Sequence, residues 1–101
     1  MEKRKPDHDL ANIKSAFADP KTLNRTFTAK QGADALGMDD DAVVAVIQGL
    51  SPHDFDKSMT SMADHRVWQD VYRPHVEGRE LYVKFTLDSQ GALLLISFKE
   101  A

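Results

Sequence analysis

The sequence contains no cysteine among its 101 residues. That absence excludes disulfide bonds, thiolate zinc sites and catalysis by a thiol nucleophile, and it fits a reducing compartment. Long hydrophobic runs are also missing, since no stretch approaches the ~18 apolar residues of a membrane span. No apolar run follows the opening MEKRKPDHD, so we expect no signal peptide, no membrane association and a cytoplasmic location.

The chain also lacks an excess of positive charge. The chain carries 13 Lys and Arg against 16 Asp and Glu, which gives a net charge of −3. This balance alone argues against nucleic-acid binding, because phosphate-binding domains are usually basic. From Lys57 onward, however, the Lys and Arg residues equal the Asp and Glu residues in number. A basic face in that half therefore requires that the carboxylates point away from it.

The first half of the chain has helical spacing. DLANIKSAFADP predicts a helix that Asp9 or Asp7 can cap and that Pro20 ends. A β-leaning LNRTFT follows, and TAKQ then has the form of a capping box at Thr28, before a stop at Gly37. DDDAVVAVIQGL predicts a further helix from about residue 39, because carboxylates in the first turn complement the helix dipole.

The second half changes to the two-residue period of strands. FDKSMTSM alternates loosely, and VWQDVYR predicts a strand that ends at Pro74. RELYVKFTLDSQGALLLISFK predicts two strands joined by a turn at residues 88–91. Helices followed by three or four antiparallel strands predict an α+β fold, with the helices packed on one face of the sheet. The length predicts a single domain, residues 1–101, with a small core.

Side-chain alternation assigns the two faces of the last two strands. The apolar side of ELYVKFTL contains Leu81, Val83, Phe85 and Leu87. The side of ALLLISFK that ends in Phe98 contains Ala92, Leu94, Ile96 and Phe98, and Leu95 falls on the other side. If both of these sides face the core, Tyr82, Lys84 and Lys99 share the open face of the sheet.

The strand VWQDVYR divides in the same way. One side carries Trp68, Asp70 and Tyr72, and the other carries Gln69, Val71 and Arg73. We expect Trp68 and Tyr72 to pack under the helices. Lys57 and Gln69 can join Tyr82 on the open face, although the sequence does not fix their register. Arg73 is a candidate for contact with phosphate or for a salt bridge to Asp70.

A face that gathers lysines and a tyrosine has the parts for RNA cleavage without a metal. The 2′-OH must lose a proton, the pentacoordinate phosphate needs cations, and the 5′-oxygen needs a proton. Lysine and tyrosine can supply all three if burial and neighbouring cations lower their pKa values. From alternation alone the commoner outcome is an ordinary solvated face. The four histidines are dispersed without metal-ligand spacing, so we expect no metal site and no cofactor.

Several longer strings resemble one protein family. MEKRKP, GLSPHDFDKSMT, DHRVWQDVYRP and ISFKE closely resemble the motility quorum-sensing regulator (MqsR) toxins, in order and spacing, over essentially the whole chain. The resemblance implies a RelE-like fold and a ribosome-independent endoribonuclease that cuts mRNA at GCU-type sites. It also implies neutralisation by an MqsA-type antitoxin, a zinc-containing protein with a DNA-binding domain, and repression of the operon by the complex. Operator DNA would then be contacted only through the antitoxin.

Carried over by position, the resemblance implies a catalytic set of Lys57, Gln69, Tyr82 and Lys99. We expect Tyr82 and Lys57 to share the proton transfers, with Lys99 stabilising the phosphate and Gln69 orienting the substrate. Candidates for binding the RNA are Met59, Arg73 and Lys84.

Two features depart from the family pattern. Asp56 stands where the resemblance predicts an aromatic residue, and alternation directs it away from Lys57. The hairpin LDSQGALL is also longer than the pattern. The alternative function is a non-catalytic binding module that acts as a co-repressor with a DNA-binding partner, which the acidic balance favours. The two functions differ in whether phosphodiester bonds are broken in the absence of metal.

Overall fold

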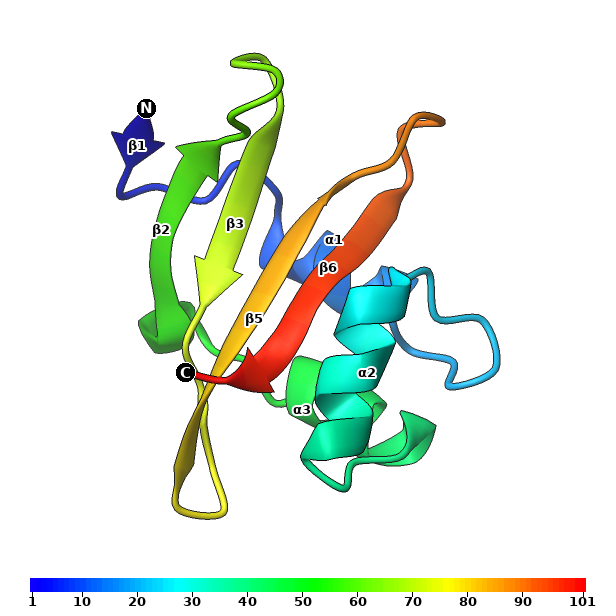
Figure 1. Cartoon of the computed structure of the whole chain (residues 1–101). Coiled ribbons are helices and arrows are strands. Elements are labelled where there is room, and N and C mark those ends of the chain that lie inside the picture. The colour runs from blue at the N-terminus through cyan, green and yellow to red at the C-terminus, as the bar shows by residue number, and fades with distance from the viewer.

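The computed structural model describes residues 1–101 and consists of three helices and one antiparallel sheet (Figure 1). The helical elements are α1 (Leu10–Ala16), α2 (Phe27–Ala35), α3 (Asp40–Gln48) and the short 3-10 helix η1 (Pro52–Asp54). The strands are β1 (Glu2–Lys3), β2 (Phe55–Thr60), β3 (Trp68–Tyr72), β4 (His75–Val76), β5 (Arg79–Leu87) and β6 (Leu93–Glu100). The α+β class is confirmed. None of the helices has the length and apolarity needed to cross a membrane.

The helices begin at capping side chains. The side chain of Asp9 accepts a hydrogen bond from the backbone N–H of Ala11, which selects Asp9 over Asp7 as the cap of α1. The cap of α2 is Thr26, whose Oγ1 lies 3.1 Å from the backbone nitrogen of Ala29. The capping box expected at Thr28 is therefore wrong by two residues. The reason is tertiary, because the N–H of Thr26 donates to β6 and the chain leaves the sheet edge at that point.

The sheet has the strand order β1-β2-β3-β5-β4, with β6 paired along the other side of β5. Strand β5 is thus central: it pairs with β3 at residues 83–85, with β4 at residues 79–80 and with β6 at residues 81–87. The short strands β1 and β4 were not predicted. The β-leaning LNRTFT makes a single bridge, between Arg25 and Leu95.

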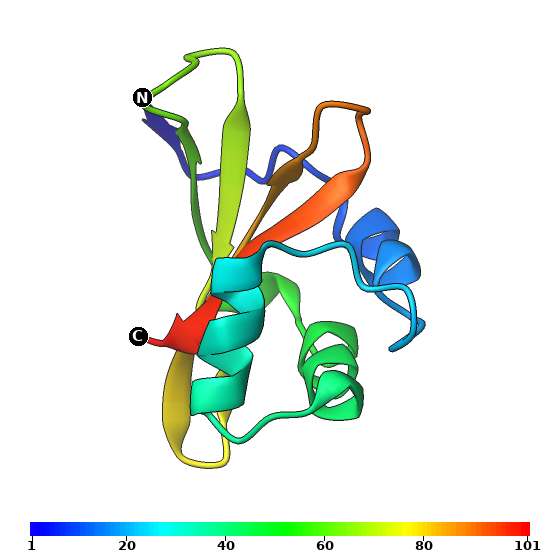
Figure 2. The same ribbon diagram turned by 45° about the vertical axis from the view of Figure 1, so that its right-hand side comes forward.

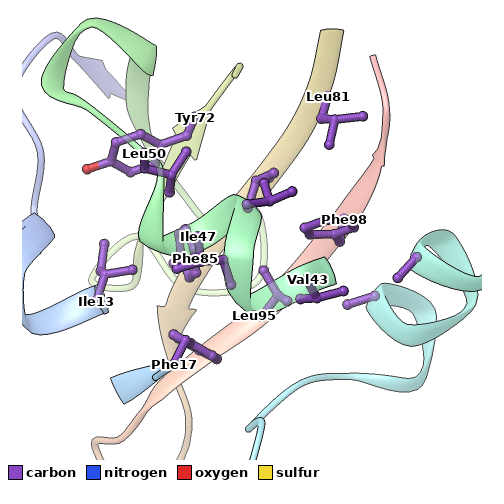
Figure 3. Close-up of a cluster of buried hydrophobic side chains, with 14 of the residues drawn as sticks. Ile13, Phe17, Val43, Ile47, Leu50, Tyr72, Leu81, Phe85, Leu95 and Phe98 are labelled. Atoms are coloured by element: carbon purple, nitrogen blue, oxygen red, sulfur yellow. The ribbon is translucent and has the colours of Figure 1, made fainter. Parts of the chain in front are cut away.

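One face of the sheet carries the hydrophobic core. Helices α1 and α3 cover this face, and α2 packs along the edge strand β6 (Figures 1 and 2). A Cβ on Gly32 of α2 would overlap the carbonyl oxygen of Phe98, so the close approach of α2 to β6 requires glycine. Figure 3 shows the labelled core side chains between α3 and the sheet, with Phe17 beside Phe85 at a ring-centroid distance of 5.4 Å. The predicted core positions Leu81, Val83 and Phe85 are fully buried.

A bulge in β6 corrects the predicted face of that strand. Lys84 pairs with Ser97, but Phe85 pairs with Leu95, so one residue of β6 is left over between them. Leu95 and Phe98 therefore both point into the core, whereas Leu94 and Ile96 are only half-buried. Strict alternation, which placed Leu95 on the open side, is wrong before the bulge. It holds after the bulge, where Lys99 opposes Tyr82.

A buried carboxylate anchors the segment that precedes α1. Asp70 is fully buried in β3, and its side-chain oxygens accept hydrogen bonds from the backbone N–H groups of Asp7 and His8 at 2.8–3.1 Å. Buried carboxylates are stable only when hydrogen-bonded, and these donors satisfy that need. Asp70 is consequently occupied by backbone, and Arg73 forms its salt bridges elsewhere.

Candidate active site

The cross-strand register places the predicted lysines on one face. Lys57 pairs with Val71, Val71 pairs with Lys84, and Lys84 pairs with Ser97. Directly paired residues of an antiparallel sheet point to the same side. Val83, which precedes Lys84 in β5, is a core residue. Successive residues of a strand point to opposite faces, so Lys84 and the residues paired with it lie on the side opposite the core. The register of Lys57, which the sequence left open, therefore puts it on the open face.

Three cations surround the ring of Tyr82 on this face. The guanidinium carbon of Arg73 lies 5.2 Å from the ring centroid, and the Nζ atoms of Lys99 and Lys84 lie at 5.4 and 5.7 Å. Cations within ~6 Å of an aromatic centroid are attracted to the ring. The residue that follows β3 and strands β5 and β6 thus bring three positive charges to one phenol. We call Tyr82 with Arg73, Lys84 and Lys99 the cation ring.

Gln69 and Met59 lie on the same face, beyond the lysine row. They pair with each other across β2 and β3, two residues along their strands from Val71 and Lys57. Both side chains are half-buried. All seven residues singled out from the sequence are therefore on the open face of the sheet. Their catalytic and binding roles stay predictions.

Three carboxylates at this face were not expected. Glu2 of β1 lies 3.3 Å from Nζ of Lys57. The guanidinium of Arg73 is held by Asp56 at 3.2 Å and by Glu80 at 3.0 Å. The register shifts between Phe55 and Lys57, and this irregularity accompanies the contact of Asp56 with Arg73. Asp56 was expected to face away from Lys57, and its ion pairs are indeed with Arg73 and Arg4 and not with Lys57.

Some cations of the site are paired with carboxylates, and others are not. Glu80 and Asp56 raise the pKa of Arg73 by hydrogen bonding, so this guanidinium is a fixed positive charge. Lys84 is half-buried and forms no ion pair. Burial lowers the pKa of Lys84, and the charges of Lys99 and Lys57 lower it further. Both effects favour the neutral amine of Lys84.

The aromatic residues of β3 have structural roles. Tyr72 is buried against Phe55 and Phe85, at ring-centroid distances of 5.5 and 6.1 Å. Burial, with the charges of Asp70 and Asp9, raises the pKa of Tyr72 to about 12, so its phenol stays neutral. Trp68 is half-buried beneath the ammonium of Lys3, which lies 4.1 Å from its ring. The prediction that these aromatics pack is confirmed for Tyr72.

The site is an open surface. A hollow of about 590 Å³ lies between α3 and the β4 segment, but none of the seven site residues lines it. No group of three or more His, Asp or Glu side chains is placed to hold a metal ion. Several positive charges on one sheet face suit an extended anionic polymer, whose phosphates repeat along the chain.

Known proteins match the chain over nearly its full length. Residues 5–100 match the family described as motility quorum-sensing regulator, toxin of MqsA. The chain belongs to this family. The mRNA interferase toxin MqsR of Escherichia coli (strain K12) is 43% identical to it over 100 residues, which cover 99% of each chain. The resemblance to the motility quorum-sensing regulator toxins is therefore confirmed.

Proposed function

We propose that this chain is an endoribonuclease toxin that cleaves mRNA at GCU-like sites, independently of the ribosome and of metal ions. Full-length similarity to a protein named an mRNA interferase toxin supports the class of reaction. The single observation that supports the mechanism is the cation ring, because it gathers proton donors and positive charge on one exposed face. We propose a single RelE-like domain, residues 1–101, acting in the cytoplasm.

The site residues supply what attack by a 2′-oxygen requires. As the bond from phosphorus to the 2′-oxygen forms, negative charge accumulates on the phosphate oxygens, and fixed cations stabilise it. Arg73 and Lys99 are suited to that role, with Lys57 on the neighbouring strand. Gln69 can orient the nucleotide through its amide, beside the flexible side chain of Met59. The products are an RNA with a 2′,3′-cyclic phosphate and an RNA with a 5′-hydroxyl.

The partner that we propose is an MqsA-type antitoxin. The description of the family as the toxin of MqsA supports this pairing. In the proposal the toxin contacts operator DNA only through the antitoxin, and the complex regulates transcription of its own operon. The net charge of −3 agrees with DNA binding by the antitoxin and not by this chain, because a protein that binds DNA by itself is usually basic.

The second candidate function is a non-catalytic co-repressor. The observation in its favour is that Glu2, Asp56 and Glu80 already neutralise Lys57 and Arg73. A surface whose cations are paired in this way also occurs on proteins that bind no phosphate. The two candidates differ in a single property, which is the breaking of phosphodiester bonds.

The deciding experiment is incubation of the purified protein with a defined mRNA in EDTA, followed by mapping of the cut ends. A matched RNA in which every GCU is changed tests sequence preference, and Tyr82→Phe purified in the same way controls for contaminating ribonuclease. We expect cuts at GCU-like sites with 2′,3′-cyclic phosphate or 3′-phosphate ends. No cleavage by a folded protein, or equal cleavage by the variant, would favour the co-repressor.

A further inference from the structure

Lys84 occupies the centre of the candidate site. It lies in the central strand β5, which has β3 on one side and β6 on the other (Figure 1). Its direct cross-strand neighbours, Val71 and Ser97, carry no charge. The side chain is half-buried between them, with Nζ 5.7 Å from the centroid of Tyr82. This position isolates the amine from the solvent more than that of Lys99, which is exposed.

The charged groups around Lys84 are mostly cations. Lys57 of β2, Arg73 just after β3 and Lys99 of β6 lie on the same face, and Tyr82 lies beside Lys84 on β5. The carboxylates of the face are Glu2, Asp56 and Glu80, and each is engaged with another cation. Lys84 therefore has neither a counter-ion nor full hydration for its ammonium form, and both conditions favour the neutral amine.

We propose that Lys84 is the general base of the reaction, a role that rests on the proposed function and sharpens it. Nζ of Lys84 takes the proton of the attacking 2′-OH. The 2′-oxygen forms its bond to phosphorus, the bond from phosphorus to the 5′-oxygen breaks, and the 5′-oxygen takes a proton from the phenol of Tyr82. Solvent then removes the proton from Lys84 and restores the proton of Tyr82, so the enzyme returns to its starting state.

The other members of the site are less suited to this step. Arg73 is bound to two carboxylates, and a guanidinium does not give up its proton near neutral pH. Lys57 has the carboxylate of Glu2 to balance its charge. Lys99 is exposed to water at the end of β6, which hydrates its ammonium form. Among the lysines of this face, Lys84 alone combines burial with the absence of a carboxylate partner.

A comparison of Lys84→Arg with Lys84→Met separates this role from simple phosphate binding. Arginine keeps the positive charge but cannot act as a base, because its pKa exceeds ~12. If Lys84 is the base, Lys84→Arg lowers the cleavage rate at saturating RNA by ~100-fold or more, as Lys84→Met does. RNA binding by Lys84→Arg should stay within about threefold of wild type. Lys21→Met, which changes an exposed lysine outside the site, should cleave at the wild-type rate.

The pH dependence of the rate gives a second readout. The wild-type rate should rise with pH while Lys84 loses its proton and then level off, because only the neutral amine accepts the 2′-OH proton. The rise should disappear or move to higher pH in Lys84→Arg. An RNA with sulfur in place of the 5′-bridging oxygen tests the assignment further, since a thiolate leaves without a proton. It should restore cleavage to Tyr82→Phe and not to Lys84→Arg.

The possible results are distinguishable. Wild-type activity of Lys84→Arg, or restoration of that variant by the sulfur substrate, would overturn the assignment of Lys84 while leaving the ribonuclease function intact. Absence of cleavage by the wild-type protein would overturn both. Thermal unfolding of each variant shows whether it is folded. If Lys84→Arg does not fold, the pH profile and the sulfur substrate are applied to Lys84→Met: loss of the rise in rate with pH and no restoration support the assignment, and either a retained rise or restoration overturns it.

Discussion

The two tyrosines of the chain occupy opposite faces of one sheet. Tyr72 of β3 lies in the core between Phe55 and Phe85, where burial raises its pKa to about 12. Tyr82 of β5 lies on the open face, where three cations surround its ring. The same side chain thus serves packing on one face and is available for chemistry on the other. Its role depends on the neighbours that the cross-strand register assigns to it.

The comparison extends to the faces as a whole. The core face is mostly apolar and is covered by helices, and its burial supplies most of the free energy that stabilises the fold. The open face brings Lys57, Lys84 and Lys99 near one another, and like charges at short range are unfavourable. Stability from one face therefore offsets repulsion on the other. Substitutions on the two faces should consequently affect different measurable quantities.

The largest expected effect on stability comes from Phe85→Ala. Phe85 is fully buried against Phe17 and Tyr72, so truncation leaves a cavity and should lower the free energy of unfolding by ~3–5 kcal/mol. Urea denaturation followed by circular dichroism measures the change. Leu87→Ala in the same strand is the control. Because Leu87 is 43% exposed, this variant should lose much less free energy of unfolding. A loss below ~1 kcal/mol for Phe85→Ala would contradict the division between the faces.

The largest expected effect on activity without loss of stability comes from Tyr82→Phe. This substitution keeps the ring and its cation contacts and removes only the hydroxyl, so stability should change by less than ~0.5 kcal/mol. Cleavage should fall ~100-fold or more if Tyr82 is the proton donor to the 5′-oxygen, as proposed. Tyr72→Phe is the matched control, since it removes a hydroxyl that lies on the core face. If the two variants cleave RNA equally well, the assignment of chemistry to the open face is wrong.

Alternation predicted the part of the site that lies on one regular strand. Tyr82 and Lys84 were placed correctly, because β5 is unbroken and Leu81, Val83 and Phe85 mark its core side without ambiguity. Lys99 was also placed correctly, but only because the bulge in β6 precedes it. A bulge depends on how two strands meet, and a single strand carries no periodic signal for it.

Contacts between distant segments could not be predicted. Glu2 reaches Lys57 only because β1 pairs with β2, and a two-residue strand is too short to show a period. The ion pair of Asp56 with Arg73 coincides with a register irregularity in β2 that alternation does not reveal. The cap of α2 at Thr26 depends on a hydrogen bond to β6. In each case a contact between distant segments decides a feature that the local sequence pattern does not encode.

The smallest expected effect is a gain in stability from Lys84→Met. The pKa of Lys84 is lower in the folded protein than in the unfolded chain, so the unfolded chain binds this proton more tightly. The free energy of unfolding therefore rises with pH between the folded-state pKa and the unfolded-state pKa of Lys84. The destabilisation by the charged amine is fully present below the folded pKa and disappears above the unfolded value of ~10.4. Because Lys84 is partly exposed, solvent screens this effect, and replacement by Met should raise Tm by only a few degrees at pH 7. The gain should shrink as the pH approaches 10, and Lys21→Met should show neither the gain nor the trend. A gain that does not vary with pH would show that methionine improves packing at this position and that the charge of Lys84 does not oppose folding.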